Sequence, residues 1–191
     1  MARLGRVKGS LLVHLHHFVV RSHGEVAWQH VLELLPPEDR KILDGILIMG
    51  GWYPIGVWNR ALDRYLPAHF ADPMKGMTEL SEDIARKDLT TLYKLILKVG
   101  KPGFIIGKSG SLWGRYFDTA TLVPKELALG KWHLELAGPR LEDEAPSAYT
   151  CEAGVRGWLI GGLKLTGTKL SIVQTRCRFG GSPVCEYEAS W

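Results

Sequence analysis

The sequence has few cysteines, no long apolar run and no block of charge of one sign, and each absence excludes a class of protein. Three cysteines in 191 residues do not make a secreted disulfide framework. The first apolar run, Ser10–Val20, contains three histidines and is too short for a signal peptide or a membrane span. Lysine and arginine are scattered and the net charge is only +4, so no nucleic-acid-binding surface is expected. We therefore expect a cytoplasmic protein.

Motifs for catalysis are also missing from the sequence. There is no Gly-x-Ser-x-Gly elbow, no His-Glu-x-x-His and no cysteine–histidine pair at a recognisable spacing. Apolar residues make up 46% of the chain and charged residues 23%, which supplies enough apolar material for one folded core. We therefore expect a binding protein and not an enzyme.

Apolar residues recur at helical spacing through the first hundred residues. The predicted helices there cover about 11–20, 26–34, 38–49, 55–70 and 77–99. Downstream, the pattern predicts a helix over 102–113, a hairpin, a loop over 138–146, a helix over 147–165 and strands over 169–179 and 183–191. In the first hairpin, Trp132, Leu134 and Leu136 share one face and His133 takes the other.

The order of these elements predicts an α+β fold. N-terminal helices would pack with an antiparallel sheet made of two C-terminal hairpins that a helix separates. We expect a single domain over 1–191, with 1–100 mainly helical and 101–191 forming hairpin, helix and hairpin.

The three cysteines fall in the C-terminal part of the chain. Cys177 and Cys185 flank a glycine-containing turn, so they face each other in a symmetric hairpin, and Cys151 begins the preceding helix. Counting by two predicts that one buried face carries Val173, Thr175 and Cys177 of one strand and Cys185, Tyr187 and Trp191 of the other. Buried free thiols and a Cys177–Cys185 disulfide are both compatible with this pattern.

The segment Gln174–Tyr187, together with the upstream Cys151, resembles the closing motif of 4-vinyl-reductase-type sensor domains. This family includes ligand-sensing modules of phenol-responsive transcription activators, and it shares its fold with TRAPP trafficking subunits. In its zinc-binding members three cysteines and an acidic residue hold the metal. The resemblance therefore implies zinc at Cys151, Cys177 and Cys185, although Gln174 stands where the acidic ligand would be. The chain as a whole also resembles myxobacterial proteins.

The N-terminal residues resemble the opening of heme nitric-oxide-binding domains, which are related in fold. The residues that carry this likeness are Val7–Leu12, Phe18–Val20, Gly24, Ala27 and Trp28. Heme in that family requires an axial histidine in the middle of the chain and a Tyr-x-Ser-x-Arg contact to the propionates. No histidine lies between His69 and His133, and Tyr116–Ala120 lacks both the serine and the arginine. We therefore expect the scaffold without the heme.

The aromatic residues supply the candidate ligand site. The sensor family has an aromatic pocket between its helices and its sheet, and Trp113, Tyr116, Trp132 and Trp158 fall on the corresponding segments. A pocket and a packed core both account for these residues. Near the N-terminus, His14 and His17 lie three residues apart, a spacing that can chelate a metal, but the apolar helix around them favours a buried or interface helix.

The expected function is a stand-alone sensor domain that binds a small apolar or aromatic molecule. It would report through a protein partner or a homodimer, the latter through the apolar stripe Leu11–Val20. One alternative is an adaptor of the TRAPP type without a regulatory ligand, and a further alternative is a heme gas sensor. This interpretation depends on family likeness more than on a site.

Overall fold

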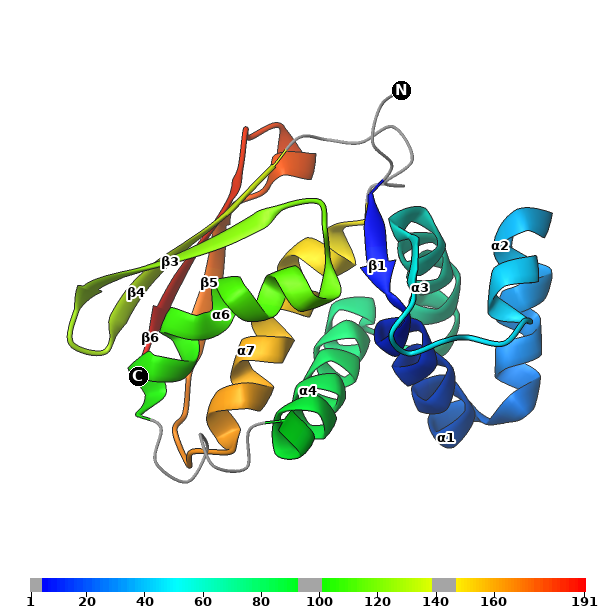
Figure 1. The fold of residues 1–191 in the computed structure, drawn as a ribbon, viewed down its shortest axis with the longest axis horizontal. Coiled ribbons are helices and arrows are strands. Elements are labelled where there is room, and N and C mark those ends of the chain that lie inside the picture. The colour runs from blue at the N-terminus through cyan, green and yellow to red at the C-terminus, as the bar shows by residue number, and fades with distance from the viewer. Residues whose placement is uncertain (1–4, 93–100, 139–146) are drawn as a thin grey trace.

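The computed structural model describes residues 5–92, 101–138 and 147–191. The last part of the predicted helix 77–99 and nearly all of the predicted loop 138–146 lie outside these residues. Residues 5–92 form a helical N-terminal half, and residues 101–138 and 147–191 form a C-terminal half built on a four-stranded antiparallel sheet (Figure 1). The predicted α+β class is confirmed.

The N-terminal half combines four helices with two short strands. The helices are α1 (Gly9–Glu33), α2 (Pro37–Leu43), α3 (Ile55–His69) and α4 (Pro73–Leu92), and the strands are β1 (Arg6–Lys8) and β2 (Trp52–Pro54). β1 and β2 pair in antiparallel fashion, with Val7 opposite Tyr53. The sequence pattern did not predict these strands because three residues are too few to show alternation.

Helix α1 joins the two helices predicted for the first 34 residues. The predicted break is present as a kink, because Gly24 has φ 84° and ψ 169°, a conformation that favours glycine. The apolar stripe of α1, which we expected to form a homodimer, is buried in the chain's own core: Leu12, Leu15 and Val19 are fully covered. That stripe is therefore unavailable to a second copy.

Helix α2 ends at Leu43 and does not continue to residue 49 as predicted. The apolar residues that suggested a longer helix, Ile46 and Ile48, lie in the following loop with 94% and 65% of their surface exposed. The prediction that the helix continues to residue 49 was wrong because these two side chains are exposed and do not pack in the hydrophobic core.

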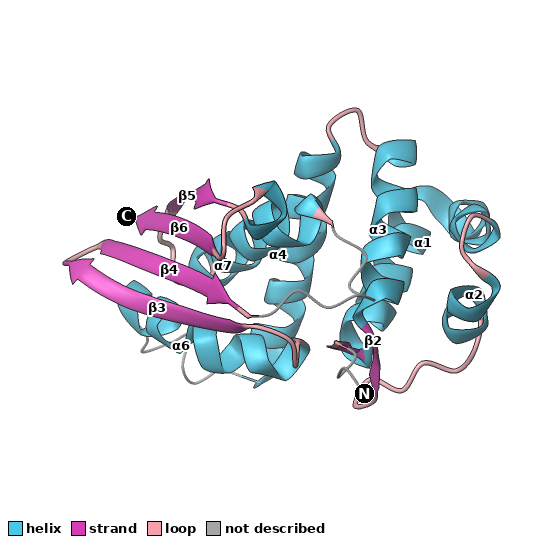
Figure 2. Cartoon of the chain, turned by 90° about the horizontal axis from the view of Figure 1, so that it is seen from above, coloured by secondary structure: helices cyan, strands magenta, loops and turns pink. Residues whose placement is uncertain are grey.

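The C-terminal half is a sheet with helices on one face. The strands are β3 (Thr121–Ala128), β4 (Lys131–Ala137), β5 (Ser171–Arg176) and β6 (Cys185–Ser190), in the order β3-β4-β6-β5. Helices α6 (Pro102–Tyr116) and α7 (Val155–Lys164) cover the inner face, and a π-helical turn, η1 (Thr150–Gly154), precedes α7 (Figure 2). Trp132, Leu134 and Leu136 are buried on that face, as predicted.

The predicted buried face of the second hairpin is correct for Cys185 and Tyr187 of β6, wrong for Trp191, and wrong for β5. Cys185 and Tyr187 are fully buried, whereas Trp191 lies beyond the end of β6 and is 38% exposed. Val173 is 58% exposed, and Thr175 also faces solvent. Ile172 is the residue of β5 that points inward. The register shifts between Gln174 and Arg176, and Cys177 lies beyond the strand, so counting by two from Cys177 reached the wrong face.

The two halves meet where α4 packs directly against α7 (Figure 1). Glycines on α7 allow the two backbones to approach closely. A Cβ at Gly157 would lie 2.6 Å from the carbonyl oxygen of Thr78, and one at Gly161 would lie 2.9 Å from the Cα of Glu82. These distances are shorter than normal van der Waals contact, so only glycine fits at either position.

Within the N-terminal half, Asp83 of α4 binds α1. Its buried carboxylate accepts hydrogen bonds from Arg21 at 2.9 Å and from Arg86 at 2.6 Å, and it pairs with Lys87 at 2.8 Å. Burial by itself raises the pKa of Asp83, but hydrogen bonds from Lys87, Arg21 and Arg86 outweigh it and lower the pKa to about 2.

This lowered pKa predicts a loss of stability in acid. Because the folded-state pKa lies below the unfolded value of 3.8, Asp83 contributes stability above about pH 4, and that contribution is lost as the pH falls towards 2. The expected loss is about 2 kcal/mol. Urea unfolding from pH 5 to pH 2 measures it, and Asp83→Asn should flatten the profile in this window. An unchanged profile in the variant would contradict the assignment.

Among the described helices, none combines the length and the apolar character needed to cross a bilayer.

Candidate functional site

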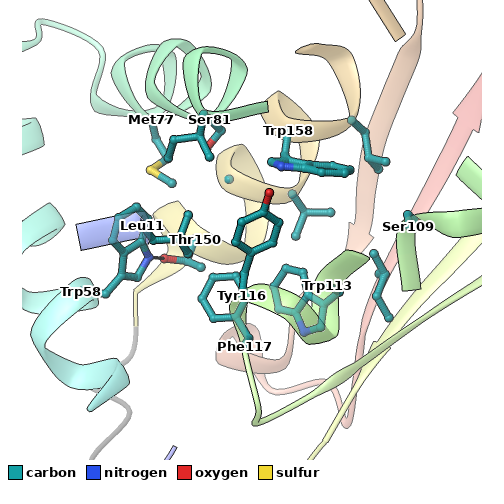
Figure 3. Close-up of a pocket in the computed structure, with 15 residues that line it drawn as sticks. Leu11, Trp58, Met77, Ser81, Ser109, Trp113, Tyr116, Phe117, Thr150 and Trp158 are labelled. Carbon is teal, nitrogen blue, oxygen red and sulfur yellow. Dashed lines mark hydrogen bonds between the residues drawn. The ribbon is translucent and has the colours of Figure 1, made fainter. Parts of the chain in front are cut away.

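A cavity lies inside the molecule where helices of the two halves meet (Figure 3). Its volume is about 50 Å³. Apolar and aromatic side chains dominate its walls: Leu11, Trp58, Met77 and Ile84 from the N-terminal half, and Trp113, Tyr116, Phe117, Val155, Trp158 and Leu159 from the C-terminal half. A cavity needs at least about 10–15 Å³ of such volume to hold one water, so the space suits a very small guest.

Three residues that line the cavity carry a buried hydrogen-bond donor that has no partner among the described residues. The donors are the Ser109 hydroxyl, Trp113 Nε1 and Trp158 Nε1. Trp58, by contrast, donates from Nε1 to Thr150 Oγ1 at 3.1 Å. Leaving a buried donor unpaired costs about 1–3 kcal/mol, so native structures usually supply a partner. The walls of the cavity itself are almost entirely apolar, so it is suited to a small apolar guest.

Three of the four aromatic residues predicted to bind ligand share this cavity, and the fourth does not. Trp113, Tyr116 and Trp158 line it, from α6 and α7. Trp132 is buried elsewhere, and its ring packs against α6 at Gly103 and Gly107. Its place in the alternating pattern with Leu134 and Leu136 already indicated a core position.

A hydrogen-bonded chain of three side chains lies beside the cavity and joins the two halves. Asp88 of α4 is hydrogen-bonded to His14 of α1, with 2.9 Å between His14 Nε2 and Asp88 Oδ1. The other carboxylate oxygen of Asp88, Oδ2, accepts a 2.6 Å hydrogen bond from the Tyr116 hydroxyl of α6. The His14 and Asp88 side chains are 9% and 15% exposed. His14 Nδ1 is buried and has no partner among the described residues. An imidazole with one nitrogen held by a carboxylate is the typical arrangement of a metal-ligating histidine.

His14, Asp88 and Tyr116 also line a groove of about 700 Å³. The remaining lining residues are Lys8, Ser10, Met49, Trp52, Lys87 and Arg115. The ammonium of Lys8 lies 4.4 Å from the centre of the Trp52 ring, so a cation and an aromatic face stand together at the groove. Ligand pockets usually measure about 300–1,000 Å³, which the groove matches and the interior cavity does not. Its lining favours a ligand with an aromatic body and negative charge.

Little in the sequence pattern indicates this groove. The spacing of His14 and His17 is compatible with a metal-chelating pair, and Asp88 lies in no motif. Their approach depends on packing between α1 and α4, which lie 74 residues apart at this contact. Tyr116 was predicted as a ligand residue and lines both the groove and the interior cavity.

The three cysteines lie at one end of the sheet as free thiols. The Cys185 sulfur accepts a hydrogen bond from the backbone N–H of Arg178 at 3.3 Å. A hydrogen bond with Cys151 is the main cause that lowers the pKa of Cys185 to about 6, and the same contact raises the pKa of Cys151. Gln174, at the position of the family's acidic ligand, donates to the Tyr187 hydroxyl at 3.3 Å. Hydrogen bonds with Cys177 also act on the Cys151 and Cys185 thiols, so the three sulfurs lie together.

Comparisons with known proteins identify the fold. The chain is similar to an H-NOX protein from S. oneidensis in the Fe(II)NO ligation state, with 14% identity, 96% of this chain and 98% of that chain covered, and a TM-score of 0.74. It is also similar to the unliganded Fe(II) A71G mutant of an H-NOX protein from K. algicida, with 11% identity, 96% and 95% covered, and a TM-score of 0.74. A structure from a study of heme distortion in the H-NOX family matches with 11% identity, 96% and 94% covered, and a TM-score of 0.63.

These likenesses establish an H-NOX-like fold over nearly the whole described chain. No family model matches the sequence, and no curated protein matches it. The fold agrees with the resemblance of the N-terminal residues to heme nitric-oxide-binding domains.

The cofactor prediction, which allowed zinc at the cysteines and set heme aside, is corrected by the same comparisons. The similar solved structures are described as Fe(II) and heme proteins. Heme was set aside because two family motifs are absent from the sequence. A missing motif excludes one set of heme contacts, whereas the groove brings together an imidazole, a phenol and several cations from other positions.

Proposed function

We propose that the chain is a ligand-binding sensor domain whose ligand occupies the groove beside the His14–Asp88–Tyr116 chain. The hydrogen bonds that join His14, Asp88 and Tyr116 support this proposal. They connect the two halves of the molecule next to a space of the size of a ligand. A ligand there would contact α1, α4 and α6 together. Binding could then change how the halves pack, which is the change a partner protein would detect.

The ligand class follows from the groove lining. Lys8 supplies a positive charge that suits a carboxylate, and Trp52 beside it offers an aromatic ring. Heme, which the similar H-NOX proteins contain, is planar, apolar and carries two propionates, so it belongs to this class and is the first ligand to test. His14 and Tyr116 are the groove residues of a type that ligates heme iron. Asp88 holds His14 Nε2 and the Tyr116 hydroxyl, and His14 Nδ1 is buried, so one of these side chains would have to turn toward the groove to reach an iron. When bound, heme would supply a ferrous iron able to take a diatomic gas.

Asp88 would have a positioning role. It fixes the ring of His14 through Nε2 and holds the Tyr116 hydroxyl at the same time. A carboxylate in this position sets the tautomer of the imidazole and increases its basicity. The interior cavity, which Tyr116 also lines, offers a separate space for a small guest.

Titration of the purified protein with hemin tests the proposal. We expect one equivalent to bind with a sharp Soret band, and His14→Ala to weaken binding at least tenfold. His30→Ala is the matched control, because His30 is an exposed histidine of the same helix that does not line the groove; it should bind as the wild type does.

The remaining outcomes separate the alternatives. If hemin does not bind but aromatic carboxylates raise the melting temperature in a His14-dependent manner, the sensor proposal holds with a smaller ligand. If neither binds, the proposal is contradicted, and an adaptor function without a regulatory ligand becomes the better explanation.

A further inference from the structure

The outer face of the sheet carries a cluster of metal-ligating side chains that is separate from the groove. His133 and Glu135 are two residues apart on β4 and so project from the same face, and Glu186 of β6 is the cross-strand partner of Glu135. One ligand atom from each of the three lies within 4.8 Å of the others. All three residues are half-buried. The alternating pattern of the first hairpin predicts the outward position of His133 but no metal site.

The two carboxylates of this cluster form an unfavourable pair without a cation. Glu135 and Glu186 are directly opposite each other on the two central strands of the sheet, and like charges in that position destabilise a sheet. Arg176 lies 3.5 Å from Glu186, but its side chain is 61% exposed, so solvent screens its charge. A doubly charged cation between the carboxylates would balance both of them.

We propose that His133, Glu135 and Glu186 bind one divalent transition-metal ion. An imidazole nitrogen together with two carboxylates suits Mn²⁺, Fe²⁺ or Co²⁺, whereas Mg²⁺ and Ca²⁺ prefer oxygen ligands alone. Three ligands on one side of the ion leave its other positions to water or to an anion from solvent. Because adjacent strands hold all three residues, the site is built on a rigid part of the fold.

Co²⁺ is the probe, since its visible absorption reports the ligands. Titration of metal-free protein, followed by calorimetry and absorption, should show one equivalent bound without a thiolate charge-transfer band. We expect His133→Ala and Glu135→Gln each to weaken binding at least tenfold. Glu188→Gln is the control: it removes a carboxylate from the same face, opposite His133, and should change the affinity less than twofold.

Two further measurements keep the outcome clear. The melting temperature of metal-free His133→Ala should equal that of the wild type, because the side chain is on the surface of the sheet; Co²⁺ should then raise the melting temperature of the wild type only. Absence of Co²⁺ binding, equal binding by His133→Ala, or loss of binding in Cys185→Ser would overturn the proposal. None of these results depends on whether the groove binds heme.

Discussion

Replacing Gly157 by alanine is expected to lower the free energy of unfolding by about 1–3 kcal/mol, although alanine is the better helix former. The added methyl group would lie 2.6 Å from the Thr78 carbonyl oxygen and 2.9 Å from the Thr78 Cα, both of them backbone atoms of α4. Backbone atoms cannot rotate away as the end of a side chain can. The helices α4 and α7 must therefore separate, which loosens the contact between the two halves.

Gly114→Ala is the matched control for this prediction. Gly114 lies in α6, is exposed, and has no atom within 4 Å of the position that its Cβ would take. That variant should gain up to about 1 kcal/mol from helix propensity. Urea unfolding of both variants measures the difference. If Gly157→Ala is as stable as Gly114→Ala, the close approach of α4 and α7 is wrong.

Replacing Asp88 by alanine is expected to cost about 2–4 kcal/mol of stability and to remove ligand binding from the groove. The variant leaves the His14 ring and the Tyr116 hydroxyl without their shared acceptor in a site that is mostly buried. Asp88→Asn should be milder, because the amide retains one acceptor oxygen while losing the charge.

Asp44→Ala controls for the loss of an exposed aspartate at the end of a short helix, and it should change the stability by less than about 0.5 kcal/mol. Urea unfolding gives the stability, and hemin titration gives the binding. Equal free energies of unfolding for Asp88→Ala and Asp44→Ala would show that the hydrogen bonds from Asp88 to His14 and Tyr116 contribute nothing to stability. Loss of binding with retained stability in Asp88→Asn would instead assign Asp88 a role in the site alone.

Where the pattern was strong, prediction from the sequence was reliable. The alternation of Trp132, Leu134 and Leu136 correctly gave the buried face of β4, because strand geometry places every second side chain on the same side. The pattern failed where one residue of irregular backbone intervened: the shift between Gln174 and Arg176 reversed the predicted face of β5. Exposed apolar residues after Leu43 extended a predicted helix beyond its end for a similar reason, since the pattern does not show burial.

By itself, the sequence determined the α+β class, the order of the helices and hairpins, and the aromatic character of the region between them, because these depend on interactions among near neighbours. Only the tertiary structure decided which aromatic residues share a cavity and that Trp132 is not one of them. It also decided that His14, Asp88 and Tyr116 meet, with separations of 74 and 28 residues, and that His133 stands beside Glu186. Contacts between distant segments depend on how helices and strands pack, and no local periodicity encodes that packing.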